Sequence, residues 1–104
     1  MGSKQRQFLT ATIFDKRGRV LSVGHNSYDK THPRQAKYAA RVGCSEKMYL
    51  HAEISALIKC REKPHKILIE RRDRFGNFKL AKPCPICELA IKEAGIKFVE
   101  YSVG

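Results

Sequence analysis

The first third of the chain carries two short runs of β-prone residues. Residues 8–14 form the first run, and residues 20–24 form the second after a polar turn that contains Gly18. A glycine there can adopt a positive φ at no steric cost, so the pattern predicts a β-hairpin. The polar stretch that follows is irregular, with one weakly patterned helix expected over residues 35–42.

The rest of the chain predicts two helices, each followed by a strand. Apolar residues recur at helical spacing within residues 51–61, and residues 66–70 then have the apolar run of a buried strand. Pro85 suits the first position of a second helix, which Gly95 ends, and residues 97–101 alternate like a final strand. Strand, helix and strand in this order favour a crossover between parallel strands, so we expect an α/β fold.

Composition limits the class and the compartment. The 104 residues have room for one compact domain, residues 1–104, and their 42% apolar and 30% charged content is globular. No apolar run approaches the roughly 20 residues that span a bilayer, and the N-terminus lacks the apolar stretch of a signal peptide. We therefore expect a cytoplasmic protein without a membrane partner, whose cysteines are reduced thiols.

Charge is the strongest compositional signal. The formal net charge is +11, and an excess of this size favours a polyanionic or phosphorylated partner over a solvated basic surface. A basic hairpin is expected over residues 71–79, just before Cys84, where it would border the candidate site. Its cations could contact phosphate or nucleic acid, and a solvated hairpin is an equal alternative. These cations are Arg71, Arg72, Arg74 and Lys79.

Two cysteines have the spacing of metal ligands. Cys84 and Cys87 lie three residues apart on the helix that Pro85 begins, so both can reach one ion. They belong to the first turn, where the positive end of the helix favours thiolate over thiol. Two thiolates supply half of a tetrahedral zinc site, and a pair of buried thiols is the alternative.

A histidine and a glutamate open the other helix. His51 offers a third ligand, and Glu53 can stand beside the metal without binding it. Three protein ligands leave the fourth position to water, which marks a catalytic rather than a structural zinc. A carboxylate within reach can take a proton from that water and pass it on.

Other histidines and cysteines carry weaker signals. His25, His32 and Cys44 lack the tight spacing of a ligand set, so we expect surface or core roles rather than a second zinc. Cys60 lies on a mostly apolar helix, where a cysteine usually acts as a small hydrophobe.

The combination of His51-Ala52-Glu53 with Pro83-Cys84-Pro85-Ile86-Cys87 resembles the cytidine and deoxycytidylate deaminase superfamily, which carries H-x-E and P-C-x-x-C motifs. The resemblance covers most of the chain. It implies a three-layer sandwich with a mixed sheet of about five strands and helices on both faces, here without the family's usual N-terminal helix. It also implies that Zn²⁺ is bound by His51, Cys84 and Cys87, that Glu53 is the catalytic acid and base, and that Asn26 and the backbone at Ala52 contact the substrate.

These observations lead to one principal hypothesis and two alternatives. The principal one is a zinc-dependent hydrolytic deaminase of a cytosine-containing nucleotide, which forms the uracil product and ammonia. The first alternative acts on cytosine or adenine in single-stranded DNA or RNA, including tRNA; net charge favours it, whereas the small size favours the free nucleotide. The second is a zinc-stabilised nucleic-acid-binding module, against which Glu53 argues. A homo-oligomer fits any of the three.

Overall fold

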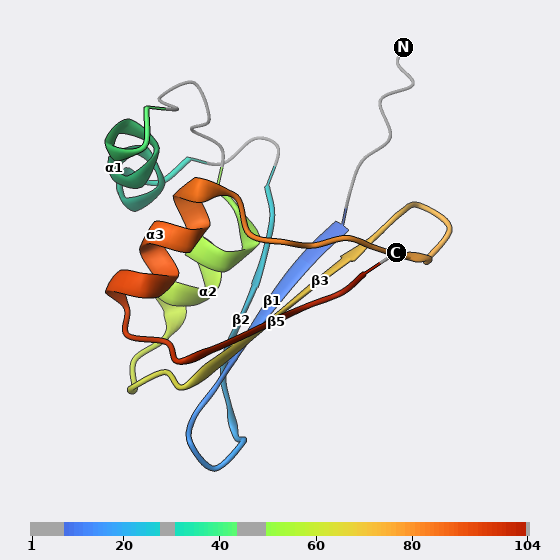
Figure 1. Ribbon diagram of the computed structural model, residues 1–104, viewed down its shortest axis with the longest axis horizontal. Helices are drawn as coiled ribbons and strands as arrows, with labels where there is room; N and C mark the ends of the chain where they lie inside the picture. The colour runs from blue at the N-terminus through green and yellow to red at the C-terminus, as the bar shows by residue number, and fades with distance from the viewer. Residues whose placement is uncertain (1–7, 28–30, 44–49, 104) are drawn as a thin grey trace.

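The structure is a computed structural model that describes residues 8–27, 31–43 and 50–103. Strands and helices are interspersed along these residues, as expected for an α/β protein (Figure 1). None of the described helices has the length and apolar character needed to cross a bilayer. The elements are β1 (Phe8–Phe14), β2 (Val20–His25), α1 (Pro33–Arg41), α2 (Ala52–Lys59), β3 (Lys66–Arg72), β4 (Phe78–Lys79), α3 (Pro85–Glu93) and β5 (Phe98–Tyr101).

The strands form one mixed sheet in the order β2-β1-β3-β4, with β5 also beside β3. β1 pairs antiparallel with both β2 and β3, and β4 pairs antiparallel with the end of β3. β5 runs parallel to β3, so the predicted crossover through α3 is confirmed. The predicted β1–β2 hairpin is confirmed too, and Gly18 in its turn has a φ of 83°.

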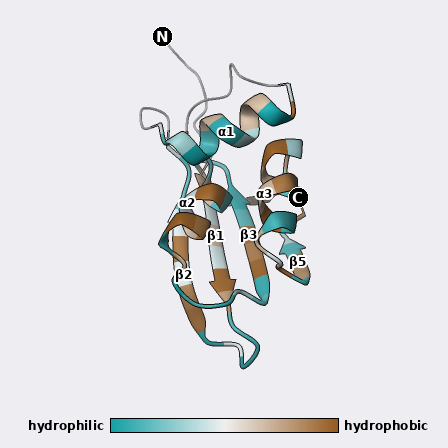
Figure 2. Ribbon diagram, turned by 90° about the vertical axis from the view of Figure 1, so that its left-hand side faces the viewer, coloured by the Kyte–Doolittle hydropathy of each residue, from teal (hydrophilic) through white to brown (hydrophobic). Residues whose placement is uncertain are grey.

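The three described helices lie on the same side of the sheet (Figures 1 and 2). The core forms beneath them, where Ala11 pairs with Ile69 and Ile13 with Ile67, all fully buried. The described chain therefore has two layers, which differs from the expected helices on both faces. Leu68, on the open face, is only partly buried. The strand over residues 66–70 is therefore buried on one face and not on both, because the helices cover only one face of the sheet.

Helix α2 approaches β2 closely at a glycine. A Cβ at Gly24 would lie 2.3 Å from the backbone nitrogen of Ala56 and 2.4 Å from the carbonyl oxygen of Ala52. Side chains do not tolerate such distances, so only glycine allows the helix to lie here. The Ser22 hydroxyl, two residues earlier on β2, donates a hydrogen bond to the Ala56 carbonyl at 2.8 Å. Together these contacts fix the position of α2 on the sheet.

Candidate metal centre

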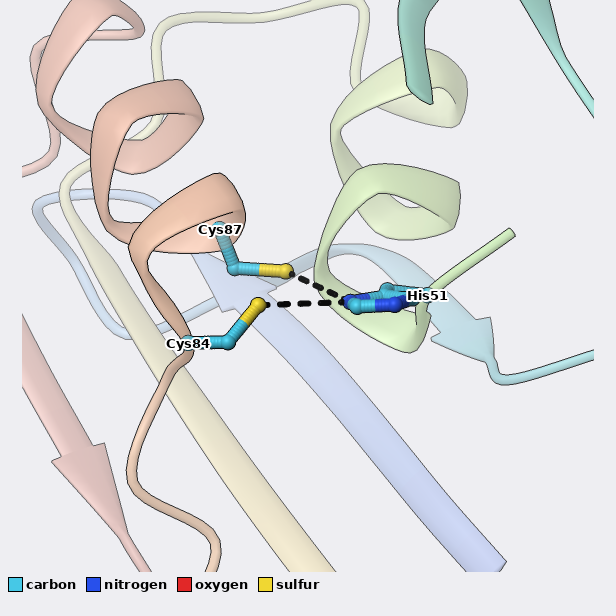
Figure 3. Close-up of side chains that lie close together, drawn as sticks. All are labelled: His51, Cys84 and Cys87. Carbon is cyan, nitrogen blue, oxygen red and sulfur yellow. Dashed lines mark hydrogen bonds between the residues drawn. The ribbon is translucent and has the colours of Figure 1, made fainter. Parts of the chain in front are cut away.

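The N-terminal ends of α2 and α3 meet and bring together the three residues that the sequence selects as metal ligands. His51 and Cys84 are the N-cap residues of the two helices, and Cys87 lies in the first turn of α3. The Nδ1 atom of His51 lies 3.3 Å from the Cys87 sulfur and 3.5 Å from the Cys84 sulfur (Figure 3). All three donor atoms lie within 4.8 Å of one another. The fold thus joins two motifs that are distant in the sequence.

These distances fit a tetrahedral zinc ion. Zn–S bonds of about 2.3 Å and Zn–N bonds of about 2.0–2.1 Å place a sulfur and a nitrogen on one zinc about 3.6 Å apart. The observed separations of 3.3 and 3.5 Å are close to this value. Cys87 is buried, whereas His51 and Cys84 are partly exposed, so the centre is accessible from one side. Three protein donors with an accessible side are typical of zinc sites that keep one position open.

The two thiols differ in acidity. A hydrogen bond from the Cys87 thiol, reinforced by His51, lowers the pKa of Cys84 to about 3. The pKa of Cys87 is raised, because its thiol gives that hydrogen bond, is buried and faces the charge of Glu53. Both sulfurs bind metals as thiolates, so metal binding here is coupled to release of the Cys87 proton.

Glu53 lies beside these donors. It occupies the second position of α2, and only 4% of its surface is exposed. Burial raises the pKa of its carboxyl group, which also shares a hydrogen bond with the Cys87 thiol. A buried carboxylate at this place, outside the group of three donors, has the location that an acid and base next to the metal requires.

Gln35 supports the centre and was not selected by the sequence analysis. Its side chain is fully buried on α1, and its Oε1 atom accepts a hydrogen bond from the His51 backbone at 3.2 Å. α1 is in turn tied to α3, because Tyr38 and Arg41 both contact the Glu93 carboxylate. The sequence signal that could have identified Gln35 is its position three residues before Tyr38, which places a polar residue on the buried face of α1.

The two expected substrate contacts lie near the start of α2. Asn26 extends the β1–β2 pairing, since its Oδ1 atom accepts from the Leu9 backbone at 3.0 Å. The next residue, Ser27, donates its backbone N–H to the Leu50 carbonyl at 2.9 Å, immediately before His51. Ala52 is fully buried as the first residue of α2. The Asn26 oxygen therefore has a structural partner at the end of the β1–β2 pairing.

The basic hairpin lies differently from its expected position at the mouth of the site. Its turn lies at the end of the long axis opposite α1 and α3 (Figure 1).

The cations of the hairpin have partners within the hairpin itself. Arg71 donates to the Leu80 carbonyl at 3.1 Å, which gives it a structural role. The guanidinium groups of Arg72 and Arg74 lie 4.0 and 4.9 Å from the ring centres of Phe78 and Phe75. The Nζ atom of Lys79 lies 3.9 Å from the Oδ2 atom of Asp73. The segment that follows β4 leads back to Cys84, so only the base of the hairpin is continuous with the centre.

The remaining histidines and cysteines have other roles. His32 caps α1 by accepting from the Arg34 backbone at 3.1 Å, and His25 lies 3.4 Å from the Thr10 hydroxyl. Cys60 donates to the Glu62 carbonyl at 3.1 Å. Cys44 lies outside the described residues.

The chain was compared with families of known proteins. The family model described as "Cytidine and deoxycytidylate deaminase zinc-binding region" matches residues 2–103. The chain belongs to this family. No curated protein matches the chain. The matched region is described as zinc-binding, and the His51, Cys84 and Cys87 group fits that description. Zinc is therefore the metal of the centre.

Proposed function

We propose that the protein is a zinc-dependent hydrolytic deaminase of a cytosine-containing nucleotide, with a deoxycytidylate-like substrate. The observation that carries the proposal is the buried Glu53 carboxyl beside a three-donor centre in a chain of the deaminase family. A structural zinc is closed by four protein ligands and has no use for an adjacent acid. The combination of an open centre and an unligated glutamate therefore favours catalysis over a zinc-stabilised binding module.

Each residue of the centre has a distinct task in this proposal. His51, Cys84 and Cys87 would hold zinc, which would supply Lewis acidity that lowers the pKa of a water molecule. Glu53 takes a proton from the attacking water, whose oxygen bonds to the ring carbon that carries the amino group. Glu53 gives this proton to the ring nitrogen, then takes the remaining proton of the added oxygen and gives it to the amino group. The carbon–nitrogen bond breaks, ammonia leaves, and the oxygen remains as the uracil carbonyl.

The electrostatics of Glu53 suit this task. A general acid and base works best when its pKa lies near the working pH, and burial moves the pKa of Glu53 upward in that direction. Its carboxyl group lies beside the Cys87 sulfur, and burial of the residue at 4% exposure keeps it at the metal donors. The side chain is thus held in place before a substrate arrives.

A free nucleotide is the substrate that we favour. The first turn of α2, which Ala52 begins, has backbone N–H groups that find no partner within the helix. Asn26 precedes Ser27, whose backbone is bonded to Leu50 just before His51, and we propose that Asn26 contacts the sugar. The turn of the hairpin lies away from the helices (Figure 1), and a single nucleotide does not need contacts so distant from its base.

An ammonia-release screen tests the proposal. Zinc-loaded protein is assayed on cytosine and adenine nucleosides, on their mono- and triphosphates, and on single-stranded oligonucleotides. We expect the highest kcat/KM for a cytosine deoxynucleotide. Absence of ammonia from every substrate, with zinc bound and the fold intact, contradicts the proposal.

A second candidate substrate is a base within a single strand of nucleic acid. The observation that favours it is the exposure of Phe75 and Phe78, 72% and 42%, each with an arginine over its ring. Exposed aromatic rings beside cations are the surfaces on which single strands stack. Higher kcat/KM on oligonucleotides than on nucleotides in the same screen would favour this substrate.

A further inference from the structure

A basic hollow lies at the other ends of the helices that form the metal centre. It has a volume of about 320 Å³ and is lined by the β1–β2 turn, the loop between α2 and β3, and the turn between α3 and β5. Because α2 and α3 begin at the metal centre and end at this hollow, about 12 Å of helix, at 1.5 Å per residue, separates the two. The hollow is therefore distinct from the substrate site.

Positive charge is in excess here. Five lysines and arginines line the hollow against two acidic residues. Asp15, one of the two acids, is already satisfied: it accepts from the Arg17 and Arg19 backbones at 2.9 Å and from Arg19 Nε at 2.7 Å. These hydrogen bonds lower the pKa of Asp15 and pair its charge with Arg19. The other four cations make no ion pair within the described residues, and they are Lys16, Arg17, Lys63 and Lys97.

The dipoles of the two helices do not cancel this positive charge. The C-termini of α2 and α3 both point toward the hollow, and each is equivalent to about −0.5 elementary charge. Together they offset about one of the three excess positive charges, so the hollow keeps a net attraction for anions.

The walls of the hollow are held by the sheet. The His65 backbone donates to the Phe14 carbonyl at 2.9 Å and accepts from the Lys97 backbone at 3.0 Å. The His65 ring packs against Phe98 with ring centres 5.1 Å apart. The backbone that carries Lys97 is therefore fixed, which reduces the entropy lost when a ligand binds.

We propose that this hollow binds a small molecule with two or more linked phosphates. Its volume lies near the lower end of the about 300–1,000 Å³ range of small-molecule sites. One phosphate monoester carries about −1.5 to −2 charge, but the four cations without ion pairs stand on three separate segments around the hollow, so linked phosphates reach more of them than a single phosphate does. Linked phosphates match their number, and lysine and arginine are the residues that bind phosphate oxygens.

Calorimetry on the full zinc-loaded chain tests the proposal with tripolyphosphate as the probe. We expect one tripolyphosphate per chain, with tighter binding than inorganic phosphate. Lys63→Gln combined with Lys97→Gln should weaken tripolyphosphate binding about tenfold, since each exposed charge contact contributes up to about 1 kcal/mol. The matched control, Lys37→Gln with Lys79→Gln, removes the same charge from exposed positions on α1 and β4 and should change affinity by less than twofold.

Three results would overturn the proposal. Equal weakening in both double variants would mean attraction by net charge alone, and wild-type affinity in the first variant would remove the hollow as the site. Binding of a single-stranded oligonucleotide but not of tripolyphosphate would identify a nucleic-acid surface instead. If the first variant does not fold, Arg17→Gln in the exposed turn repeats the test. The Glu53→Gln variant should bind tripolyphosphate normally, so failure here is distinguishable from failure of the proposed deaminase activity.

Discussion

Gly24 is the point at which a single methyl group should displace the helix that carries His51 and Glu53. The Cβ of Gly24→Ala would lie 2.3 Å from the Ala56 nitrogen and 2.4 Å from the Ala52 oxygen. Normal contacts are about 3.5–4.0 Å, so α2 must move by more than about 1 Å. Forcing extra volume into a packed site costs about 1–3 kcal/mol, and we expect this loss in the free energy of unfolding. His51 would shift with the helix, so zinc affinity should fall as well.

Urea denaturation and competition with a zinc chelator measure the two effects. Gly18→Ala is the matched control: its φ of 83° disfavours alanine, but nothing lies within 4 Å of the added Cβ. It should lower stability by about 1 kcal/mol through backbone strain and leave zinc affinity unchanged. Wild-type stability and zinc affinity in Gly24→Ala would refute the close packing of α2 on β2.

Two further predictions concern the support of His51 and the hairpin. Gln35→Leu removes the acceptor of the His51 backbone N–H, and an unsatisfied buried group costs about 1–3 kcal/mol. We therefore expect lower stability in denaturation and weaker zinc binding in chelator competition. Unchanged values of both would contradict the supporting role of Gln35. Arg72→Ser with Arg74→Ser should leave nucleotide deamination unchanged if free nucleotides are the substrate. For a strand-acting enzyme, oligonucleotide activity should fall and the salt slope of binding should decrease by about 1.4, at about 0.7 per lost phosphate contact; unchanged oligonucleotide kinetics would exclude that use of the hairpin.

The sequence predicted those features that depend on short-range patterns. Cys84 and Cys87 could be paired because their spacing on a helix determines that both point to one side. The turn at Gly18 and the start of α3 at Pro85 also follow from local backbone preferences. The family motifs then linked His51 to the cysteines, and the fold placed their donor atoms together.

Features that depend on packing between distant elements could not be read in this way. The contact of Gln35 with His51 requires α1 to lie against the start of α2, which no spacing within α1 specifies. Gly24 fits a turn or a strand end equally well in the sequence, whereas its close contact with Ala52 and Ala56 arises only when helix and sheet meet. The direction of the basic hairpin depends likewise on the twist of the sheet.

Ammonia release by Glu53→Gln shows whether this carboxyl group moves the protons of the reaction. The substitution keeps the shape of the side chain and removes its ability to take a proton. Zinc content should stay near one ion per chain in the wild type and the variant, and Glu88→Gln, an exposed acid on α3, should retain full activity as the control. We expect Glu53→Gln to lower turnover of the best nucleotide by about 10²-fold to 10⁴-fold. Turnover near the wild-type value with zinc retained would contradict this role of Glu53.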